Sequence, residues 1–114
     1  MNESNSEEQQ QREDHRLRLH FAELRALGEG NYSNLCVIAG KVCGLGRYMF
    51  TTGILVGMTT DTPYERRYCY EQARDAFDAL LAWDGTGHPG GPWIKVKGQM
   101  NGRWLDELGP GATQ

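Results

Sequence analysis

The sequence has few cysteines, and none has the spacing of a disulfide framework or a zinc site. There are three, an odd number, with no C-x-x-C pair: Cys36, Cys43 and Cys69. The N-terminus also lacks the apolar stretch of a secretory signal. We therefore expect reduced thiols and a cytoplasmic protein.

No uninterrupted apolar run is long enough to span a membrane. The most apolar window, Leu35 to Met58, has Lys41 and Arg47 near its middle and is interrupted by glycines. A charge at the centre of a bilayer costs about 2.5–3.5 kcal/mol on insertion scales. This window is better explained by β-strands, and we expect no membrane partner.

The first fourteen residues contain almost nothing that a core could bury. From Met1 to Asp14 there are five acids, one arginine and no apolar residue after Met1. Such a segment cannot offset its chain entropy, so we expect a disordered acidic arm. The whole chain has 12 Lys and Arg against 15 Asp and Glu, a net charge of −3, and without the arm the counts are 11 and 10. A near-neutral folded part neither favours nor excludes nucleic acid.

The remaining residues fit one folded domain over 15–108, followed by a flexible tail over 109–114. Apolar spacing and strong helix formers predict a helix over His15–Leu27 that ends at Gly28. Apolar and β-branched residues around Leu35–Val42 and Gly53–Met58 predict a hairpin or meander. The turn is expected at Gly44–Gly46.

Two interpretations are open for the segment that follows. Thr62 to Glu65 fits a capping box, which would start a helix that runs to Trp83. Alternatively, Arg66–Tyr70 is a strand and the helix begins near Glu71. The alternation of tyrosine and cysteine with arginine favours the strand.

The next elements complete an α+β pattern. The helix from Glu71 carries an apolar stripe of Ala73, Ala76, Phe77, Leu80 and Leu81. Trp93–Lys97 is expected to be a strand, and Arg103–Leu108 one helical turn. We predict an antiparallel β-meander of about three or four strands, with one main helix packed on it and an N-terminal helix.

Glycine, proline and tryptophan are concentrated in WDGTGHPGGPWIKVKG, Trp83–Gly98. Its G-x-G-x-x-G string resembles a dinucleotide fingerprint, which must follow a strand and open a helix. Here a helix precedes it, and the negative end of the helix dipole repels phosphate. We expect a structural helix-to-strand connection and no cofactor. Its structural residues are Trp83, Asp84, Gly85, Gly87 and Gly90.

The block from Arg67 to Gly98 resembles a recurrent block in small uncharacterised bacterial and phage proteins. The shared features are the tyrosine-rich strand, an alanine-rich helix, WDGTG and the PWIKVKG that follows. The resemblance implies the strand at Arg66–Tyr70 and carries no activity. The C-terminal Asp106–Pro110 departs from the Asn-Pro ending of that block.

A partner-binding surface is expected on the strand after this loop. Since Ile94 and Val96 fit the core, alternation places Trp93, Lys95 and Lys97 on the outward face. With His88 and Arg103 nearby, these residues form a candidate aromatic and basic contact surface.

No catalytic constellation and no metal-ligand spacing is present in the sequence. Cys69 with His88 is the one thiol–imidazole pairing worth testing. We therefore expect a small non-enzymatic module that binds a larger host protein or complex, by size class a phage or mobile-element inhibitor of host defence, similar to anti-CRISPR proteins. The alternatives are a nucleic-acid-binding module that uses the aromatic and basic strand face, and a small thiol- or metal-dependent enzyme.

Overall fold

The computed structural model describes residues 3–112 and confirms the α+β class. Its centre is a six-stranded antiparallel sheet in which the strands follow chain order from β1 to β6. The meander is therefore longer than the three or four strands expected. The elements are α1 (Glu3–Gly28), β1 (Tyr32–Ile38), β2 (Lys41–Arg47), β3 (Thr52–Val56), β4 (Arg66–Tyr70), α2 (Ala73–Ala82), β5 (Lys95–Met100) and β6 (Arg103–Leu108).

The main core lies between one face of the sheet and α2, which crosses β2, β3 and β4. Since side chains alternate along a strand, every second residue of the central strands points into this layer. The sheet contributes Cys43, Leu45, Ile54, Val56, Tyr68, Tyr70 and Val96, and α2 contributes Ala76, Ala79 and Leu80. The α2-facing side of the sheet is thus fully packed at its centre.

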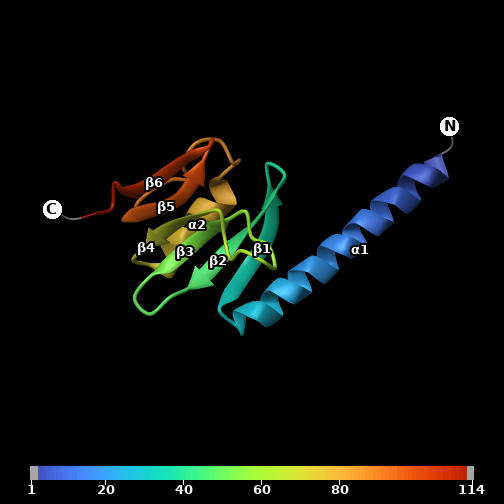
Figure 1. The fold of residues 1–114 in the computed structure, drawn as a ribbon, viewed down its shortest axis with the longest axis horizontal. Coiled ribbons are helices and arrows are strands. Elements are labelled where there is room, and N and C mark those ends of the chain that lie inside the picture. The colour runs from blue at the N-terminus through green and yellow to red at the C-terminus, as the bar shows by residue number, and fades with distance from the viewer. Residues whose placement is uncertain (1–2, 113–114) are drawn as a thin grey trace.

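A smaller cluster holds the end of α1 against the other face of the sheet. Leu24 is buried there with Leu55 and Met58. N-terminal to this contact α1 extends away from the body, so that its first turns and the end of β6 lie far apart along the longest axis (Figure 1). Among the strands, α1 therefore packs closest to β1, and Leu24 adds a contact to Leu55 of β3.

The structure has a helix where we predicted a disordered arm. Residues 3–14 form the first turns of α1, and residues 1 and 2 lie outside the described part. Glutamate, glutamine and arginine are strong helix formers. The segment also continues the helix whose later turns are held against the sheet by Leu24, so it extends a helix that is already formed. The side chains from Ser6 to Arg16 are all exposed, so the correction concerns the backbone alone.

The predicted flexible tail is also corrected, as far as it is described. Gly109 donates a backbone hydrogen bond to the carbonyl of Ile94 (3.0 Å), and Gly111 to that of Trp93 (2.9 Å). A Cβ at either glycine would overlap the segment it contacts. Residues 109–112 are therefore bound to the body, and 113–114 lie outside the described residues.

Two turns differ from the prediction. The chain reverses after β1 at Ala39-Gly40, with φ of 50° and 79°, and Gly44 and Gly46 lie inside β2. A Cβ at Gly44 would stand 2.6 Å from Leu35 Cδ2 and 3.1 Å from Ser33 O, so a larger residue at this strand position would require the Leu35 side chain to move. Asn101 connects β5 to β6 with Gly102, which makes Arg103–Leu108 a strand and not a helical turn.

The strand interpretation of Arg66–Tyr70 is confirmed, and α2 begins two residues after Glu71. The apolar stripe of α2 is rotated from the predicted one. Ala76, Ala79 and Leu80 are buried, whereas Leu81 is 68% exposed. The alanines face the sheet because a small residue lets the helix approach the bulky tyrosines of β4.

Candidate binding surface on the open half of the sheet

Trp93, the aromatic residue expected on the surface, is buried. It is 6% exposed and precedes β5, which begins at Lys95, so strand alternation does not set its direction. Its indole Nε1 donates to the carbonyl of Pro89 (3.1 Å), and its ring packs edge-on against Tyr68 at 5.3 Å. Trp93 is therefore a core residue, which corrects its predicted place on the outward face.

The loop between α2 and β5 packs around the ring of Tyr68. Both tryptophans pack edge-on against this ring, Trp83 at 6.2 Å, and not on each other. Tyr70 donates its hydroxyl to Gly90 O (2.6 Å), and Trp83 Nε1 donates to Thr86 O (3.1 Å). Both side chains thus donate to backbone carbonyls of the loop, which helps to fix the path of the chain.

The turn that follows α2 uses the other loop residues expected to be structural. Asp84 Oδ1 accepts a hydrogen bond from Thr86 N (2.8 Å), which holds the pKa of Asp84 below its usual value. Gly85 and Gly87 have φ of 92° and 61°, in the left-handed region that favours glycine. The G-x-G-x-x-G string leaves a helix and leads into β5, as the sequence indicated.

His88 and Arg103 come together, but away from Lys95 and Lys97. Nδ1 of His88 shares a 2.7 Å hydrogen bond with the Tyr68 hydroxyl on the α2-facing side of the sheet. His88 and Arg103 line one shallow hollow on that side. The two lysines lie on the opposite face, so the predicted set of contact residues is divided between two faces.

Lys95 and Lys97 share their face with a different tryptophan. The register pairs Lys95 with Leu108, Lys97 with Asp106 and Gln99 with Trp104, which places all six on one side. We call this group the open sheet face: Lys95, Lys97, Gln99, Trp104, Asp106 and Leu108. Among residues 3–112, no helix packs over it.

Trp104 supplies the aromatic group that Trp93 does not. Its side chain is 59% exposed, and Leu108 is 69% exposed. The sequence contained the signal for this arrangement in Asn101-Gly102, a typical two-residue hairpin turn. A two-residue turn at this point sets the register of β6 on β5, so the sequence alone could have predicted that Trp104 lies opposite Gln99.

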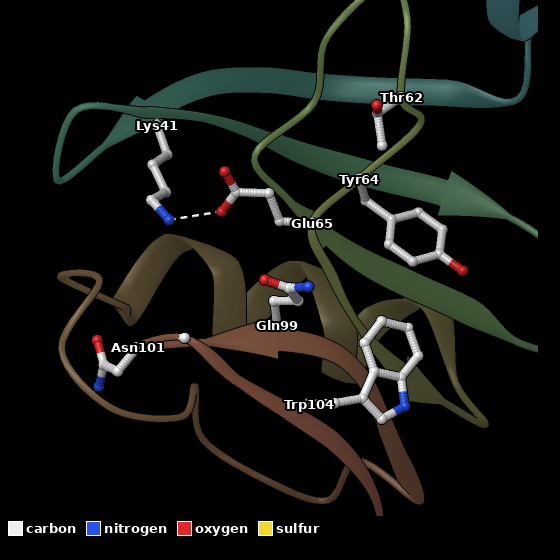
Figure 2. Close-up of a pocket in the computed structure, with 8 residues that line it drawn as sticks. Lys41, Thr62, Tyr64, Glu65, Gln99, Asn101 and Trp104 are labelled. Atoms are coloured by element: carbon white, nitrogen blue, oxygen red, sulfur yellow. Dashed lines mark hydrogen bonds and ion pairs between the residues drawn. The ribbon is translucent and has the colours of Figure 1, made fainter.

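A groove of about 550 Å³ lies at one end of the open sheet face. Figure 2 shows the rings of Tyr64, from the β3–β4 connection, and Trp104 on the same side of the groove, with Gln99 toward its middle. Lys41 reaches Glu65 at the other side, in an ion pair of 2.5 Å. The groove therefore offers two aromatic surfaces, an amide and a neutralised pair of charges.

The adjoining part of this face carries a further cation, Arg67, which lies over two tyrosine rings. The Cζ atom of Arg67 lies 4.8 Å from the ring centre of Tyr48 and 5.3 Å from that of Tyr64. Tyr48 in turn covers Gly53, where an added Cβ would stand 3.1 Å from the ring. Arg67 pairs with Lys97 across the strands, so it extends the charged part of the open sheet face.

The thiol pairing proposed from the sequence is not assembled. Tyr68 directs its hydroxyl to His88, and the next residue, Cys69, points to the opposite face. Burial raises the pKa of Cys43 to about 11 and also raises that of Cys36. Among the side chains of residues 6–112, no group of three or more His, Cys, Asp or Glu is placed to hold a metal ion.

The part of the chain described here has no helix with the length and apolar character that crossing a bilayer requires. Comparisons with protein families, with curated proteins and with solved structures find no match to this chain.

Proposed function

We propose that the chain is a small non-enzymatic module that docks on a larger protein through the open sheet face. The observation that supports this most directly is the exposure of Trp104 on a strand face that no described element covers. Tryptophan is enriched at the energetic centres of protein interfaces because it buries a large area at little entropic cost. Leu108 and the aromatic groove of Figure 2 extend the same surface.

The charges around Trp104 suit a protein better than a nucleic-acid backbone. Lys95 forms an ion pair with Asp106 (3.3 Å), and no ion pair among the described residues includes Lys97. Nucleic-acid affinity is built from several phosphate contacts, and the chain as a whole has a net charge of −3. A partner with an apolar pocket for Trp104 and an acid opposite Lys97 would match this surface.

The β2–β3 turn adds an apolar contact at the same end of the sheet as Leu108. Its two tip residues, Met49 and Phe50, are the most exposed large apolar residues described, at 87% and 84%. Figure 1 places this turn and the C-terminal end of β6 on one side of the molecule. By size class, the partner is a host complex that a phage or mobile element would inhibit.

Affinity capture with matched variants tests the proposal. We expect Trp104→Ala to lose the partner recovered by the wild type, with at least about tenfold weaker binding. Phe77→Ala, which truncates an exposed residue of α2 on the other face, should retain it. Hydrogen exchange of the recovered complex should show protection in β5 and β6. Protection confined to other elements, or no specific partner for the wild type, would contradict the proposal.

A nucleic-acid-binding module is the second candidate, favoured by the position of Lys97 and Arg67 beside an exposed tryptophan. It predicts retention on RNA or DNA that weakens as salt rises, and a further loss in Lys97→Ala. Absence of salt-dependent retention removes this candidate, whereas retention that needs both Trp104 and Lys97 would favour it over a protein partner.

A further inference from the structure

Arg66 is a buried cation without a carboxylate partner among the described residues. Its side chain is 5% exposed, and its Nη1 atom donates to the carbonyl of Gln99 (3.1 Å). Nε has no hydrogen-bond partner in the described chain, and none of the ion pairs there includes Arg66. A buried charge is stable only when it is paired or well hydrogen-bonded.

Aromatic rings offset part of this charge. The guanidinium Cζ lies 5.5 Å from the ring centre of Tyr68 and 5.9 Å from that of Trp83. Ring faces attract cations but supply no hydrogen-bond acceptor. The Nε donor of Arg66 therefore has no acceptor in the described part of the chain.

Arg66 lines a hollow of about 330 Å³ on the α2-facing side of the sheet. Three segments far apart in sequence meet there: the β1–β2 turn, the glycine-rich loop after α2 and the β5–β6 turn. Polar lining comes from Lys41, Thr86 and Asn101, and apolar lining from Ile38, Val56 and Met100. The volume is about ten times the share of one water molecule in the liquid, enough for a small organic group.

The charge of the hollow is positive by about one unit. Lys41 also borders the groove of Figure 2, where Glu65 neutralises it. Arg66 has no such neighbour among the side chains of residues 6–112. A single negative charge with two oxygen acceptors would complete the site, and a planar guanidinium matches a carboxylate in this respect.

We infer that this hollow binds a carboxylate, held by Arg66 and Lys41, with its organic part against Trp83 and the apolar wall. The carboxylate belongs to a small organic acid or to the C-terminus of another chain. The site is separate from the open sheet face and does not rest on the proposed docking function.

Titration of the full chain with two carboxylates tests this inference. Acetate presents the group alone, and N-acetylglycine imitates a chain end. We expect millimolar binding, seen as NMR shifts of the Trp83 indole N–H and of the amides of Thr86, Gly87 and Asn101. Tighter binding of N-acetylglycine identifies a chain end as the occupant, and equal binding identifies a small acid. Equal shifts with chloride at the same ionic strength, or no shift with either carboxylate, would overturn the inference.

Two variants with opposite expected effects on affinity test the site without changing Arg66. Lys41→Met should weaken N-acetylglycine binding about three- to tenfold, and Glu65→Gln should tighten it because Lys41 loses its competing carboxylate. Lys95→Met removes a lysine of similar exposure, also ion-paired, from the other face and should change nothing. Arg66→Lys should abolish binding if it folds. Unchanged affinity in both Lys41→Met and Glu65→Gln would refute the site.

Discussion

The hydroxyl of the fully buried Tyr68 lies 2.7 Å from Nδ1 of His88, a residue of the glycine-rich loop with an exposed side chain. This contact joins the centre of β4 to the loop, and the same tyrosine ring supports Trp83 and Trp93. One buried polar atom therefore depends on the loop for its partner.

Removing the Tyr68 hydroxyl and removing the His88 side chain should lower the free energy of unfolding by different amounts. Tyr68→Phe deletes the hydroxyl and should lower the free energy of unfolding by about 0.5–1.5 kcal/mol. His88→Ala leaves the hydroxyl without its partner and should cost about 1–3 kcal/mol. In a double-mutant cycle measured by urea unfolding, His88→Ala should cost less in the Tyr68→Phe background. Additive effects within about 0.5 kcal/mol would show that the hydrogen bond contributes nothing.

Gly109→Ala should destabilise the protein because a Cβ there would overlap the ring and carbonyl of Trp93. Overpacking of this kind costs about 1–3 kcal/mol, and denaturant unfolding gives the value. Gly90→Ala is the matched control, since an added Cβ at Gly90 meets no atom within 4 Å. A loss in Gly90→Ala as large as that in Gly109→Ala would contradict the close approach of the C-terminal segment to Trp93.

The two ends of α1 should differ in their contribution to stability. Deleting residues 1–14 should leave the melting temperature unchanged while lowering the helical circular dichroism, because the side chains from Ser6 to Arg16 are exposed. Leu24→Ala should cost about 2–5 kcal/mol, since Leu24 is buried against Leu55 and Met58. A deletion that leaves the dichroism unchanged would favour the disordered arm predicted from the sequence.

Stability should fall at alkaline pH through Cys43. Burial raises the pKa of its thiol from 9.0 to about 11, so the folded state retains a proton that the unfolded state releases. This contribution is complete below pH 9.0 and is lost as the pH rises to about 11. Urea midpoints measured across this range should decline, and the decline should be shallower in Cys43→Ala. An identical slope in that variant would assign the effect to other groups, such as Tyr70, whose pKa burial also raises.

Local patterns were sufficient for several elements. The alternation in Arg66–Tyr70 predicted β4, the apolar stripe predicted α2, and the glycine-rich loop was predicted to connect a helix to a strand. Each of these signals lies within a few residues. The Asn101-Gly102 turn is a signal of the same kind, and its neglect led to the wrong helical assignment of Arg103–Leu108.

The candidate site was less predictable because exposure depends on distant segments. Lys95 and Lys97 were placed correctly on the outward face, but Trp93 was not, since it lies before the strand begins. Ala39 has a positive φ in the turn between β1 and β2, a conformation that alanine does not favour. The sequence therefore pointed to Gly44–Gly46 as the turn.

By itself, the sequence determined the α+β class, the strand at Arg66–Tyr70, the helix after it and the place of the glycine-rich loop between that helix and a strand. Only the tertiary structure decided which tryptophan is buried. Trp83 and Trp93 pack on Tyr68, whose position follows from the register of β4 between β3 and β5. Trp104 stays exposed because neither helix reaches the β5–β6 half of that face in the described chain. Burial depends on which layers the fold brings together, and that information is not carried by any single segment.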